Sequence, residues 1–586
     1  MKHIKQCLAL LLILALLAGC AAAEAELSDD SEARAAHSVP KESPVEGNIC
    51  DNPALYEGRD PYSVINMYLT VSSGNEADSS NHTWTEVNSY SAYYYEDLGV
   101  DRYKVEGILQ IDDGSGLGEG SYGYGEVVPN VTVQVRGQTS SRSALKNYKI
   151  RIKDGKGEYN GQRTLALNKH AYEPFRFLNK MCYDLLADIP QLMSARTQFV
   201  RLYVKDTTEG GSGEYVDYGL YTMVEQINKT YLSNHGLDDH GKLYKVNMFE
   251  WILYDAIMAV GDDYDEDEFE FYLEIKGSDD HADLRNVLTL LENYSIPITE
   301  IIEEHFDAEN LCYWTAFQIL VGNYDSGPRN LYIYSPLNSK KWYFISWDMD
   351  ASFRRNYFER IGYVEGQSWE QGLTQYVILT MVNRMMKEER YRQMLDDAIH
   401  DLMAHALKAE VIAERAAMYS AVVKEDIYQN PFSQSFSGLS PEEYDEFVGK
   451  LAGEIQMNYE SYQESLKRSW PFYVNLPVDN GEGFFYSWEI SYDIHGESVT
   501  YSYQIATDYQ FQNVLYEDSS LSIPYAETQR LEPGTYYLRV QATNESGYTT
   551  DCYDYFKVSG IGKIYGCYCF AVLEDGTIKY GVEEEE

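Results

Sequence analysis

The feature that most constrains this chain is a short segment in which two aspartates and an asparagine surround two apolar stretches. Asp325 stands five residues before Asn330, and Asp348 follows residues 331–334 and 342–345, which have the composition of strands. Aspartate and asparagine side chains supply hard oxygen atoms, the ligands that Mg²⁺ prefers. The segment therefore predicts oxygen ligands or bases arranged beside a hairpin.

The turn of this hairpin decides which side chains meet. The polar residues 336–340 separate the two strands, so we expect an antiparallel hairpin centred on Asn338 or Ser339. Such a hairpin returns Asp348 to a place roughly opposite Asn330. Aspartate and asparagine are also common in turns for conformational reasons, so the spacing alone does not assign a function.

The same order of residues occurs in protein kinases, where the catalytic loop precedes two strands and a metal-binding aspartate. The sequence GNYDSGPRNLYIY followed by WYFISWDMDASF resembles the core of the spore coat protein H (CotH) family of atypical, secretory-type kinases. Residues 135–152 and 218–232 agree with the same family. The resemblance covers roughly residues 60–400, and three segments in the right order are more specific than any one of them.

The resemblance implies a fold, a set of cofactors and a set of roles. The fold class would be α+β, with a two-lobed atypical protein-kinase-like domain followed by a small all-β sandwich. ATP and Mg²⁺, or Mn²⁺, would be the cofactors. Asp325 would be the catalytic residue and Asp348 a metal ligand, while Asn330 as second metal ligand follows from the kinase analogy. Asp350 is either a further metal ligand or a structural hydrogen-bonding residue.

A second predicted hairpin, residues 131–152, has a tip rich in Gly, Ser and Thr that could cover phosphates. Lys149 on its return strand is the candidate phosphate-pairing lysine, although an exposed strand lysine would look the same. Glu225 follows an apolar strand where a kinase has its hinge, and it could instead support the fold. The residues expected to bind the nucleotide are Arg136, Ser140, Arg142, Lys146, Lys149 and Glu225.

The charge of the chain limits its partners. Lys+Arg 47 against Asp+Glu 93 gives a net charge of −46, which disfavours nucleic acid and anionic lipid surfaces. A locally basic pocket would still be required for ATP. The 44% hydrophobic and 14% aromatic content indicates a folded chain rather than a disordered one.

The N-terminus predicts export and a lipid anchor. Two lysines precede an apolar run that is too short to span a bilayer, and LAGC at residues 17–20 resembles the lipobox of bacterial lipoproteins. Residues 1–19 would be the signal peptide, Cys20 the lipidated residue and 20–48 a flexible tether. An ordinary cleaved secretion signal is the alternative. The expected location is the bacterial cell envelope, outside the cytoplasm and anchored to the membrane.

The rest of the chain changes character twice. Strand patterns dominate up to about residue 172, Glu173–Pro174 is expected to open a helix, and helical patterns prevail from Asp283. Short alternating strands follow near Pro471 and resemble a fibronectin type III-like sandwich. The predicted domains are a CotH kinase-like domain over residues 49–470, the sandwich over 471–559 and a C-terminal tail over 560–586.

Two functions follow from these expectations. The first is a lipid-anchored protein kinase that transfers the γ-phosphate of ATP to Ser or Thr of protein substrates. The second is a catalytically silent kinase-like scaffold or adhesin acting in binding or envelope organisation, which the scarcity of ATP outside a bacterial membrane favours. The sandwich could bind a cell-surface ligand, but its fold alone assigns no function.

Overall fold

The computed structural model describes residues 51–362, 370–430, 438–558 and 562–581. The predicted signal peptide (1–19), the lipidation site Cys20 and the tether (20–48) lie outside these ranges. None of the helices in the described ranges combines the length and the apolarity that crossing a membrane requires.

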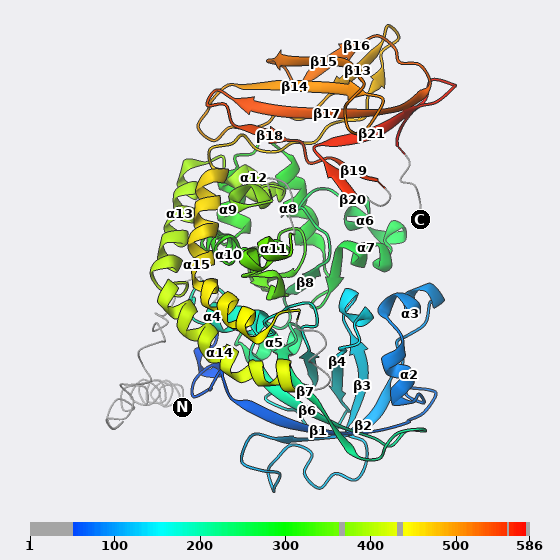
Figure 1. Ribbon diagram of the computed structural model, residues 1–586, viewed down its shortest axis with the longest axis vertical. Coiled ribbons are helices and arrows are strands. Elements are labelled where there is room, and N and C mark those ends of the chain that lie inside the picture. Colours follow the sequence, from blue (N-terminus) through cyan, green and yellow to red (C-terminus); the bar gives the residue numbers. More distant parts are fainter. Residues whose placement is uncertain (1–50, 363–369, 431–437, 559–561, 582–586) are drawn as a thin grey trace, which may run out of the picture. The chain divides into compact units, whose positions relative to one another are not determined.

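Seven of the described strands close into a barrel, in the order β1-β2-β3-β4-β5-β7-β6 (Figure 1). They are β1 (Val64–Ser72), β2 (Val105–Asp112), β3 (Val131–Arg136), β4 (Asn147–Ile152), β5 (Thr164–Asn168), β6 (Thr197–Asp206) and β7 (Tyr215–Glu225). Buried residues alternate with more exposed ones along β1, β2 and β3, as expected for strands with one face toward a barrel core. The β3–β4 hairpin predicted from the sequence is present, with Arg136 paired to Asn147 at its tip end.

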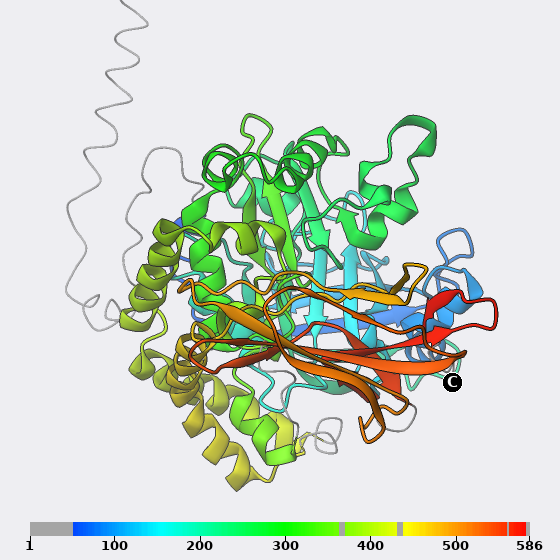
Figure 2. The same cartoon turned by 90° about the horizontal axis from the view of Figure 1, so that it is seen from above.

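A helix-rich part follows the barrel, and its central helix is α10 (Ala308–Val321). Eleven of the residues of α10 are buried, so it is a core helix rather than an amphipathic surface helix. It contacts α13 (Glu389–Ala404) and α15 (Pro441–Ser465), and α15 also contacts α14 (Ala409–Gln429). Helices α13, α14 and α15 lie together along one side of the central strands in the view of Figure 2.

The remaining described helices are shorter. They are α2 (Trp84–Ser89), α3 (Ala92–Leu98), α4 (Leu178–Leu186), α5 (Lys229–Asn234), α6 (Asp255–Met258), α7 (Glu266–Tyr272), α8 (Ala282–Glu292), α9 (Ile298–His305), α11 (Arg355–Ile361) and α12 (Thr380–Met385). Helices α2 and α3 belong to the barrel part, where α3 contacts the one-turn helix η3 (Thr139–Arg142).

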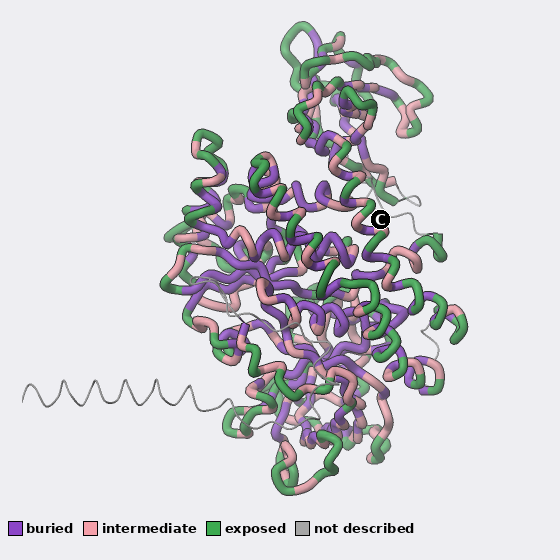
Figure 3. Tube along the Cα trace, turned by 90° about the vertical axis from the view of Figure 1, so that its left-hand side faces the viewer, coloured by how far each residue is buried: buried purple, intermediate pink, exposed green. Residues whose placement is uncertain are grey.

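A second sheet lies in the helix-rich part and carries the segment with the two aspartates. Its strand order is β11-β10-β8-β9, with β8 (Lys242–Val246), β9 (Leu273–Ile275), β10 (Leu331–Ser335) and β11 (Tyr343–Ser346). Every residue of β10 and β11 is buried, in keeping with the continuous purple of the central tube in Figure 3. This buried sheet provides a rigid base for the loops at its ends.

The start of α4 differs from the sequence expectation. Glu173 and Pro174 were expected to open the helix, but α4 begins at Leu178. The Glu173 carboxylate accepts hydrogen bonds from the N–H groups of Phe175 (2.7 Å), Arg176 (2.6 Å) and Leu178 (3.1 Å). Arg176 has φ +61°, which a helix does not allow. The residues between Glu173 and the start of α4 therefore form a loop, and the Glu173 side chain accepts hydrogen bonds from its amides.

The C-terminal part is all-β. Two of its sheets have the orders β12-β13-β16 and β15-β14-β17-β21-β22, with β18 on β17, while β19 pairs with β20. The bounds are β12 (Val478–Asp479), β13 (Phe484–Ser487), β14 (Val499–Ala506), β15 (Val514–Leu521), β16 (Tyr525–Thr528), β17 (Gly534–Asn544), β18 (Thr549–Asp551), β19 (Tyr555–Val558), β20 (Gly562–Tyr565), β21 (Cys567–Val572) and β22 (Ile578–Tyr580).

One expectation about this part needs correction. Residues 560–586 were expected to be a tail, yet β21 pairs with β17 along six residue pairs and buries Phe570 completely. The alternating apolar residues of 567–572 therefore complete a core rather than follow one. The α+β class with a two-lobed body and a C-terminal all-β region is confirmed, whereas the fibronectin-like nature of that region stays a prediction.

Candidate functional site

The hairpin β10–β11 has the register that the sequence predicted. Leu331 pairs with Ser346, which places the centre of the hairpin between Asn338 and Ser339. The Trp347 N–H donates a hydrogen bond to the carbonyl oxygen of Asn330 at 3.3 Å. Asp348 therefore lies one residue beyond the position opposite Asn330.

The loop before β10 holds Asp325 and Asn330 against each other. Helix α10 ends at Gly322 in the left-handed conformation, which turns the chain toward Asp325. Asn330 donates from Nδ2 to the Asp325 carboxylate at 2.9 Å and to the Asp325 carbonyl at 2.8 Å. Because its NH₂ is used in this way, Oδ1 is the atom of Asn330 that could bind a metal. Arg329 also pairs with Asp325 at 2.7 Å.

Two of these residues have unusual backbone conformations. Asn330 has φ +57° and Asp348 has φ +54°, in the left-handed region that few non-glycine residues adopt. Such conformations persist only where the surroundings impose them, and they are common at functional sites. Neither conformation was predicted from the sequence.

Buried polar side chains impose this geometry. The Asn179 side chain on α4 accepts a hydrogen bond from the Met349 N–H at 3.0 Å, and the Tyr183 hydroxyl accepts one from the Asp348 N–H at 3.1 Å. Gln318 joins Asn323 to Ser346 through bonds of 2.9 Å each. Gln318 and Asn323 were not predicted from the sequence. They could have been recognised as polar residues within, and just after, the mainly apolar helix α10.

Four carboxyl groups surround the end of the hairpin, and we refer to them as the Asp348 cluster: Glu173, Asp325, Asp348 and Asp350. Asp348 is open to solvent on one side, yet protein atoms displace water from the others, and this desolvation raises its pKa. Arg136 opposes the rise and Asp325 adds to it. Desolvation and the charge of Asp348 raise the pKa of Asp350 well above its ordinary value.

Glu173 behaves in the same way, since burial raises its pKa to about 7 despite nearby Arg354. Carboxylates that raise one another's pKa in this manner form an environment in which a divalent cation is favoured. The donor atoms of the Asp348 cluster therefore fit a Mg²⁺ or Mn²⁺ ion, with Asn330 as an additional oxygen ligand.

The cluster is not a closed metal cage. In the part of the chain that the structure describes, Asp238, Asp239 and His240 are the group of three whose ligand atoms all lie within 4.8 Å of one another. His240 is largely exposed, and Asp238 is used to hold the Leu337 N–H at 2.7 Å. A cation at Asp348 would thus need further oxygen atoms, which phosphates and water supply to Mg²⁺ in many enzymes.

Cationic side chains gather near the same carboxylates. Arg136, at the end of β3, donates to Asn168 Oδ1 and lies close enough to Asp348 for their charges to interact. Loss of water and the nearby charges of Lys276 and Arg136 lower the pKa of Lys149. The charge of Lys245, on β8, acts on Asp348. In a chain of net charge −46, this is the locally basic site that a polyphosphate requires.

Lys245 and Lys276 were not foreseen from the sequence. Both are attached to the β8–β9 pair, where Glu274 interacts with Lys245 at 3.6 Å and is paired with Lys276. They are far along the chain from the residues they act on, since the charge of Lys276 acts on Lys149 and that of Lys245 on Asp348. No local sequence signal could have identified them.

The tip of the β3–β4 hairpin uses its polar residues differently. The Arg142 guanidinium lies 3.9 Å from the centre of the Tyr93 ring, and Lys146 donates to the Ser141 carbonyl at 2.6 Å. The Ser140 hydroxyl accepts a hydrogen bond from Asn147 at 3.0 Å. These three predicted nucleotide-binding residues are thus engaged within the tip and with α3. Arg136 instead interacts with Asp348, and the charge of Lys149 interacts with that of Arg136.

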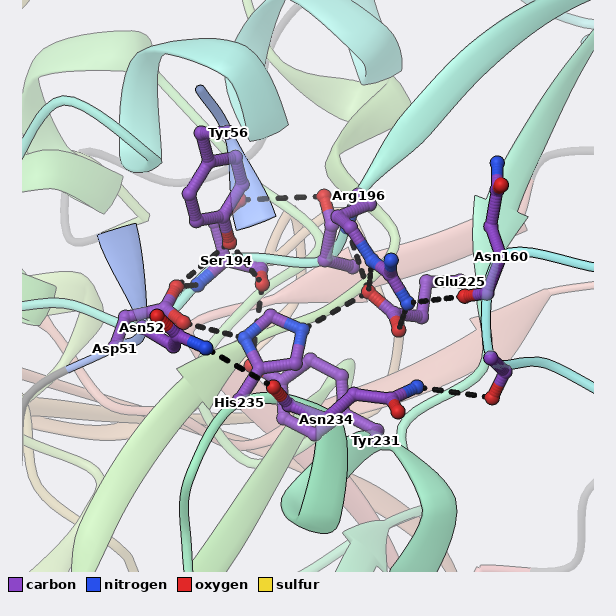
Figure 4. Close-up of polar contacts among 12 residues, drawn as sticks. Asp51, Asn52, Tyr56, Asn160, Ser194, Arg196, Glu225, Tyr231, Asn234 and His235 are labelled. Carbon is purple, nitrogen blue, oxygen red and sulfur yellow. Dashed lines mark hydrogen bonds and ion pairs between the residues drawn. The ribbon is translucent and has the colours of Figure 1, made fainter. Parts of the chain in front are cut away.

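Glu225 lies at the end of β7 in a buried group of charges that we call the Glu225 network: Asp51, Arg196, Glu225 and His235 (Figure 4). Arg196 Nε donates to Glu225 at 2.9 Å, and the two nitrogens of His235 reach Glu225 at 2.9 Å and Asp51 at 2.5 Å. Burial would raise the pKa of Glu225, but Arg196 and His235 outweigh it and hold the pKa at about 2. The direct nucleotide contact expected of Glu225 stays a prediction.

The fold and these residues together define a two-lobed, kinase-like protein. The family described as CotH kinase protein matches residues 133–468, which is more than half of the chain. The chain belongs to the CotH family.

Two individual proteins are similar to the chain. Inner spore coat protein H of Bacillus subtilis (strain 168) is 22% identical over 273 residues, which are 45% of this chain and 68% of that protein. A solved structure of the twitchin kinase region from C. elegans (Fn31-NL-kin-CRD-Ig26) shares 10% identity and covers 69% of this chain and 70% of its own. Its TM-score of 0.16 is too low to support a structural argument.

Proposed function

We propose that this protein is a divalent-metal-dependent protein kinase that transfers the γ-phosphate of ATP to Ser or Thr hydroxyls of protein substrates. The observation that carries the proposal is the Asp348 cluster, in which carboxylates have raised pKa values and the charges of Arg136 and Lys245 act on Asp348. The charge of Lys149 in turn interacts with that of Arg136. Oxygen ligands for a cation and cations for a polyphosphate occur at the same place, which is the arrangement that phosphoryl transfer uses.

The proposed roles follow from the contacts of each residue. Asp325 accepts the proton of the substrate hydroxyl. The hydroxyl oxygen forms a bond to the γ-phosphorus while the bond from that phosphorus to ADP breaks and ADP leaves. Asp348 and Asn330 Oδ1 hold the cation, which when bound would neutralise charge on the phosphate oxygens. Arg136, through its closeness to Asp348, orients the phosphates at that end of the hairpin.

Membrane attachment is part of the proposal. Lipidation of Cys20 would anchor the protein outside the cytoplasm, and the net charge of −46 argues against any other contact with an anionic membrane. The name of the B. subtilis relative, an inner spore coat protein, supports a place in an outer layer of the cell for this chain as well.

The test uses the soluble protein, residues 21–586, with γ-labelled ATP and Mg²⁺. We expect label to appear on the protein itself or on an added protein acceptor, and to disappear in Asp325→Ala and Asp348→Ala. Equal labelling of the wild type and both variants would contradict the proposal. Acid hydrolysis of the labelled protein should release phosphoserine or phosphothreonine.

One observation favours the second function, a catalytically silent scaffold or adhesin. The Asp325 carboxylate is engaged by both Arg329 and Asn330, so a substrate hydroxyl must compete with Arg329 for it. The pair is about half exposed and therefore weak, which makes the competition easy. The test compares the transferase activity of the wild type with that of Arg329→Gln. If both proteins are inactive, the scaffold or adhesin function is the better supported one.

A further inference from the structure

A second cluster of polar groups lies in a small cavity that the proposed reaction does not use. The cavity is formed where β5, β7 and the loop before α4 meet α14. Its lining includes Asn168, Lys169, His170, Arg176, Thr222 and Asp426. Its volume is about 10 Å³, which is room for a single water-sized particle.

Three side chains in this lining have buried polar atoms without a hydrogen-bond partner among the described residues. The atoms are all three guanidinium nitrogens of Arg176, the Nε2 atom of His170 and the Oγ1 atom of Thr222. Arg176 and His170 are 6% exposed and Thr222 is 1% exposed. Native proteins pair nearly all such groups, so an unpaired set facing one cavity indicates a ligand.

The unpaired groups are hydrogen-bond donors. A guanidinium has only N–H groups to offer, and a hydroxyl can donate. Burial and the charge of Arg176 lower the pKa of His170 to about 3, so its ring is neutral and can carry a proton on Nε2. Three donors that converge without an acceptor favour an anion over a cation.

The acidic groups nearby do not supply that acceptor. Asp426 accepts from the Leu220 N–H at 3.0 Å and pairs with Lys169 at 3.5 Å. Glu173 is bonded to the three backbone amides at the start of α4. Both carboxylates interact electrostatically with Arg176, but neither forms an ion pair with it among the described residues.

From this geometry we infer that the cavity is a binding site for one small monovalent anion of the size of chloride, held by Arg176, His170 and Thr222. The cavity volume excludes phosphate and any nucleotide, so the site is separate from the proposed ATP site. A single water molecule would fit the space but carries no charge, and the two carboxylates whose charges act on Arg176, those of Asp426 and Glu173, are bonded to other groups.

The anion would act on the proposed active site indirectly. Asn168 lines the cavity and accepts a hydrogen bond from Arg136, which lies near Asp348. The anion would therefore hold the end of β5, where Asn168 bonds to Arg136. It would also stabilise the folded protein, because an unfolded chain has no such site.

The first experiment locates the anion. Crystals grown in sodium bromide, measured at the bromine absorption edge, should show an anomalous peak between Arg176, His170 and Thr222. Electron density for water without an anomalous peak, or a peak only on the protein surface, would overturn the inference. This result does not depend on catalytic activity.

The second experiment measures thermal unfolding in 0.15 M sodium chloride and in sodium gluconate of equal ionic strength. Gluconate is too large for the cavity, so chloride should raise the Tm of the wild type by about 2–4 °C. Arg176→Met should lose this difference. Thr222→Val removes one hydrogen-bond donor but keeps the shape of the side chain, and it should reduce the Tm difference between the two salts. This variant provides the test if Arg176→Met does not fold.

Arg384→Gln is the matched control. Arg384 is also 6% exposed, but its guanidinium donates to the carbonyls of Leu291 and Ile296, both at 2.6 Å. This variant should lose stability while keeping the wild-type difference between chloride and gluconate. An equal Tm of the wild type in both salts, or an unchanged difference in Thr222→Val, would contradict the anion site.

Discussion

The Glu225 network and the Asp348 cluster are both groups of charged side chains held by protein, and they differ in how their charges are balanced. In the Glu225 network, two carboxylates are matched by an arginine and a histidine at hydrogen-bonding distance. In the Asp348 cluster, four carboxyl groups lie together and the pKa values of three of them are raised. The first group is complete, whereas in the second the charges of Arg136, Lys245 and Arg354 do not offset the rise in the carboxyl pKa values.

This difference separates a structural role from a functional one. A complete buried network stabilises one conformation and leaves nothing for a ligand to bind. An incomplete one costs stability, and natural proteins keep such a cost mainly where function needs it. The following predictions test that distinction.

The largest effect should come from the catalytic loop. Asp325→Asn keeps the shape of the side chain but removes its ability to accept a proton, so phosphoryl transfer should fall by about 10²–10⁴-fold. Labelled-phosphate transfer at saturating ATP measures this. A fall of less than threefold would remove Asp325 from its proposed role.

Breaking the complete network should affect stability instead. Glu225→Gln leaves His235 and Arg196 without their carboxylate, and the free energy of unfolding should fall by about 3–5 kcal/mol. Urea unfolding followed by circular dichroism measures it. If the variant is as stable as the wild type but binds ATP weakly, Glu225 acts on the nucleotide as the hinge comparison suggested.

The basic residues of the β3–β4 hairpin should differ in how much they contribute to ATP affinity: Arg136 and Lys149 should contribute more than Arg142 and Lys146. Lys149→Met removes a cation whose charge interacts with Arg136, and it should weaken ATP binding by about tenfold. Arg142→Gln is the control, because Arg142 is occupied by Tyr93, and it should change the affinity by less than about twofold. Calorimetric titration with a non-hydrolysable ATP analogue would show whether the order is reversed.

Removing one charge from the incomplete cluster should stabilise the protein. Asp348→Asn relieves repulsion with its neighbours, so the free energy of unfolding without metal should rise by about 1 kcal/mol. The stabilisation by Mg²⁺ that we expect for the wild type should be absent in this variant. A loss of stability in Asp348→Asn would mean that the carboxylate is part of a balanced network.

The smallest effect concerns pH. Burial lowers the pKa of His235, but hydrogen bonds to Asp51 and Glu225 outweigh it and raise the pKa above 6.5. The stability that protonated His235 contributes is therefore complete below about pH 6.5 and is lost as the pH rises through the folded-state pKa. His235→Asn should remove this part of the pH dependence of Tm between pH 6 and 9. An unchanged dependence would show that His235 does not titrate there.

The sequence revealed the parts of the site that local spacing encodes. The hairpin register follows from residues 331–346 alone, and it places Asp348 near Asn330 as predicted. Lys245 and Lys276 escaped prediction because the residues on which their charges act, Asp348 and Lys149, are far from them along the chain. The same holds for Glu225. Its partner His235 is close in sequence, but its partner Arg196 and the Asp51 carboxylate that bonds to His235 are not.

The expected helix at Glu173 shows a different limit. A glutamate followed by proline is a good helix start in general, yet here its carboxylate bonds to three amides and keeps them in a loop. The cavity that Arg176 lines depends on that loop. Helix propensity therefore gave the wrong start for α4 at a place where the chain forms a polar site.

The most direct test of the proposed metal and ATP site is calorimetric titration of a non-hydrolysable ATP analogue with Mg²⁺ and, separately, with EDTA. We predict binding to the wild type that weakens by at least tenfold when the metal is removed, and that is equally weak in Asp348→Asn under both conditions. Equal affinity of the wild type with and without metal, or undiminished metal dependence in Asp348→Asn, would contradict a divalent cation held at Asp348.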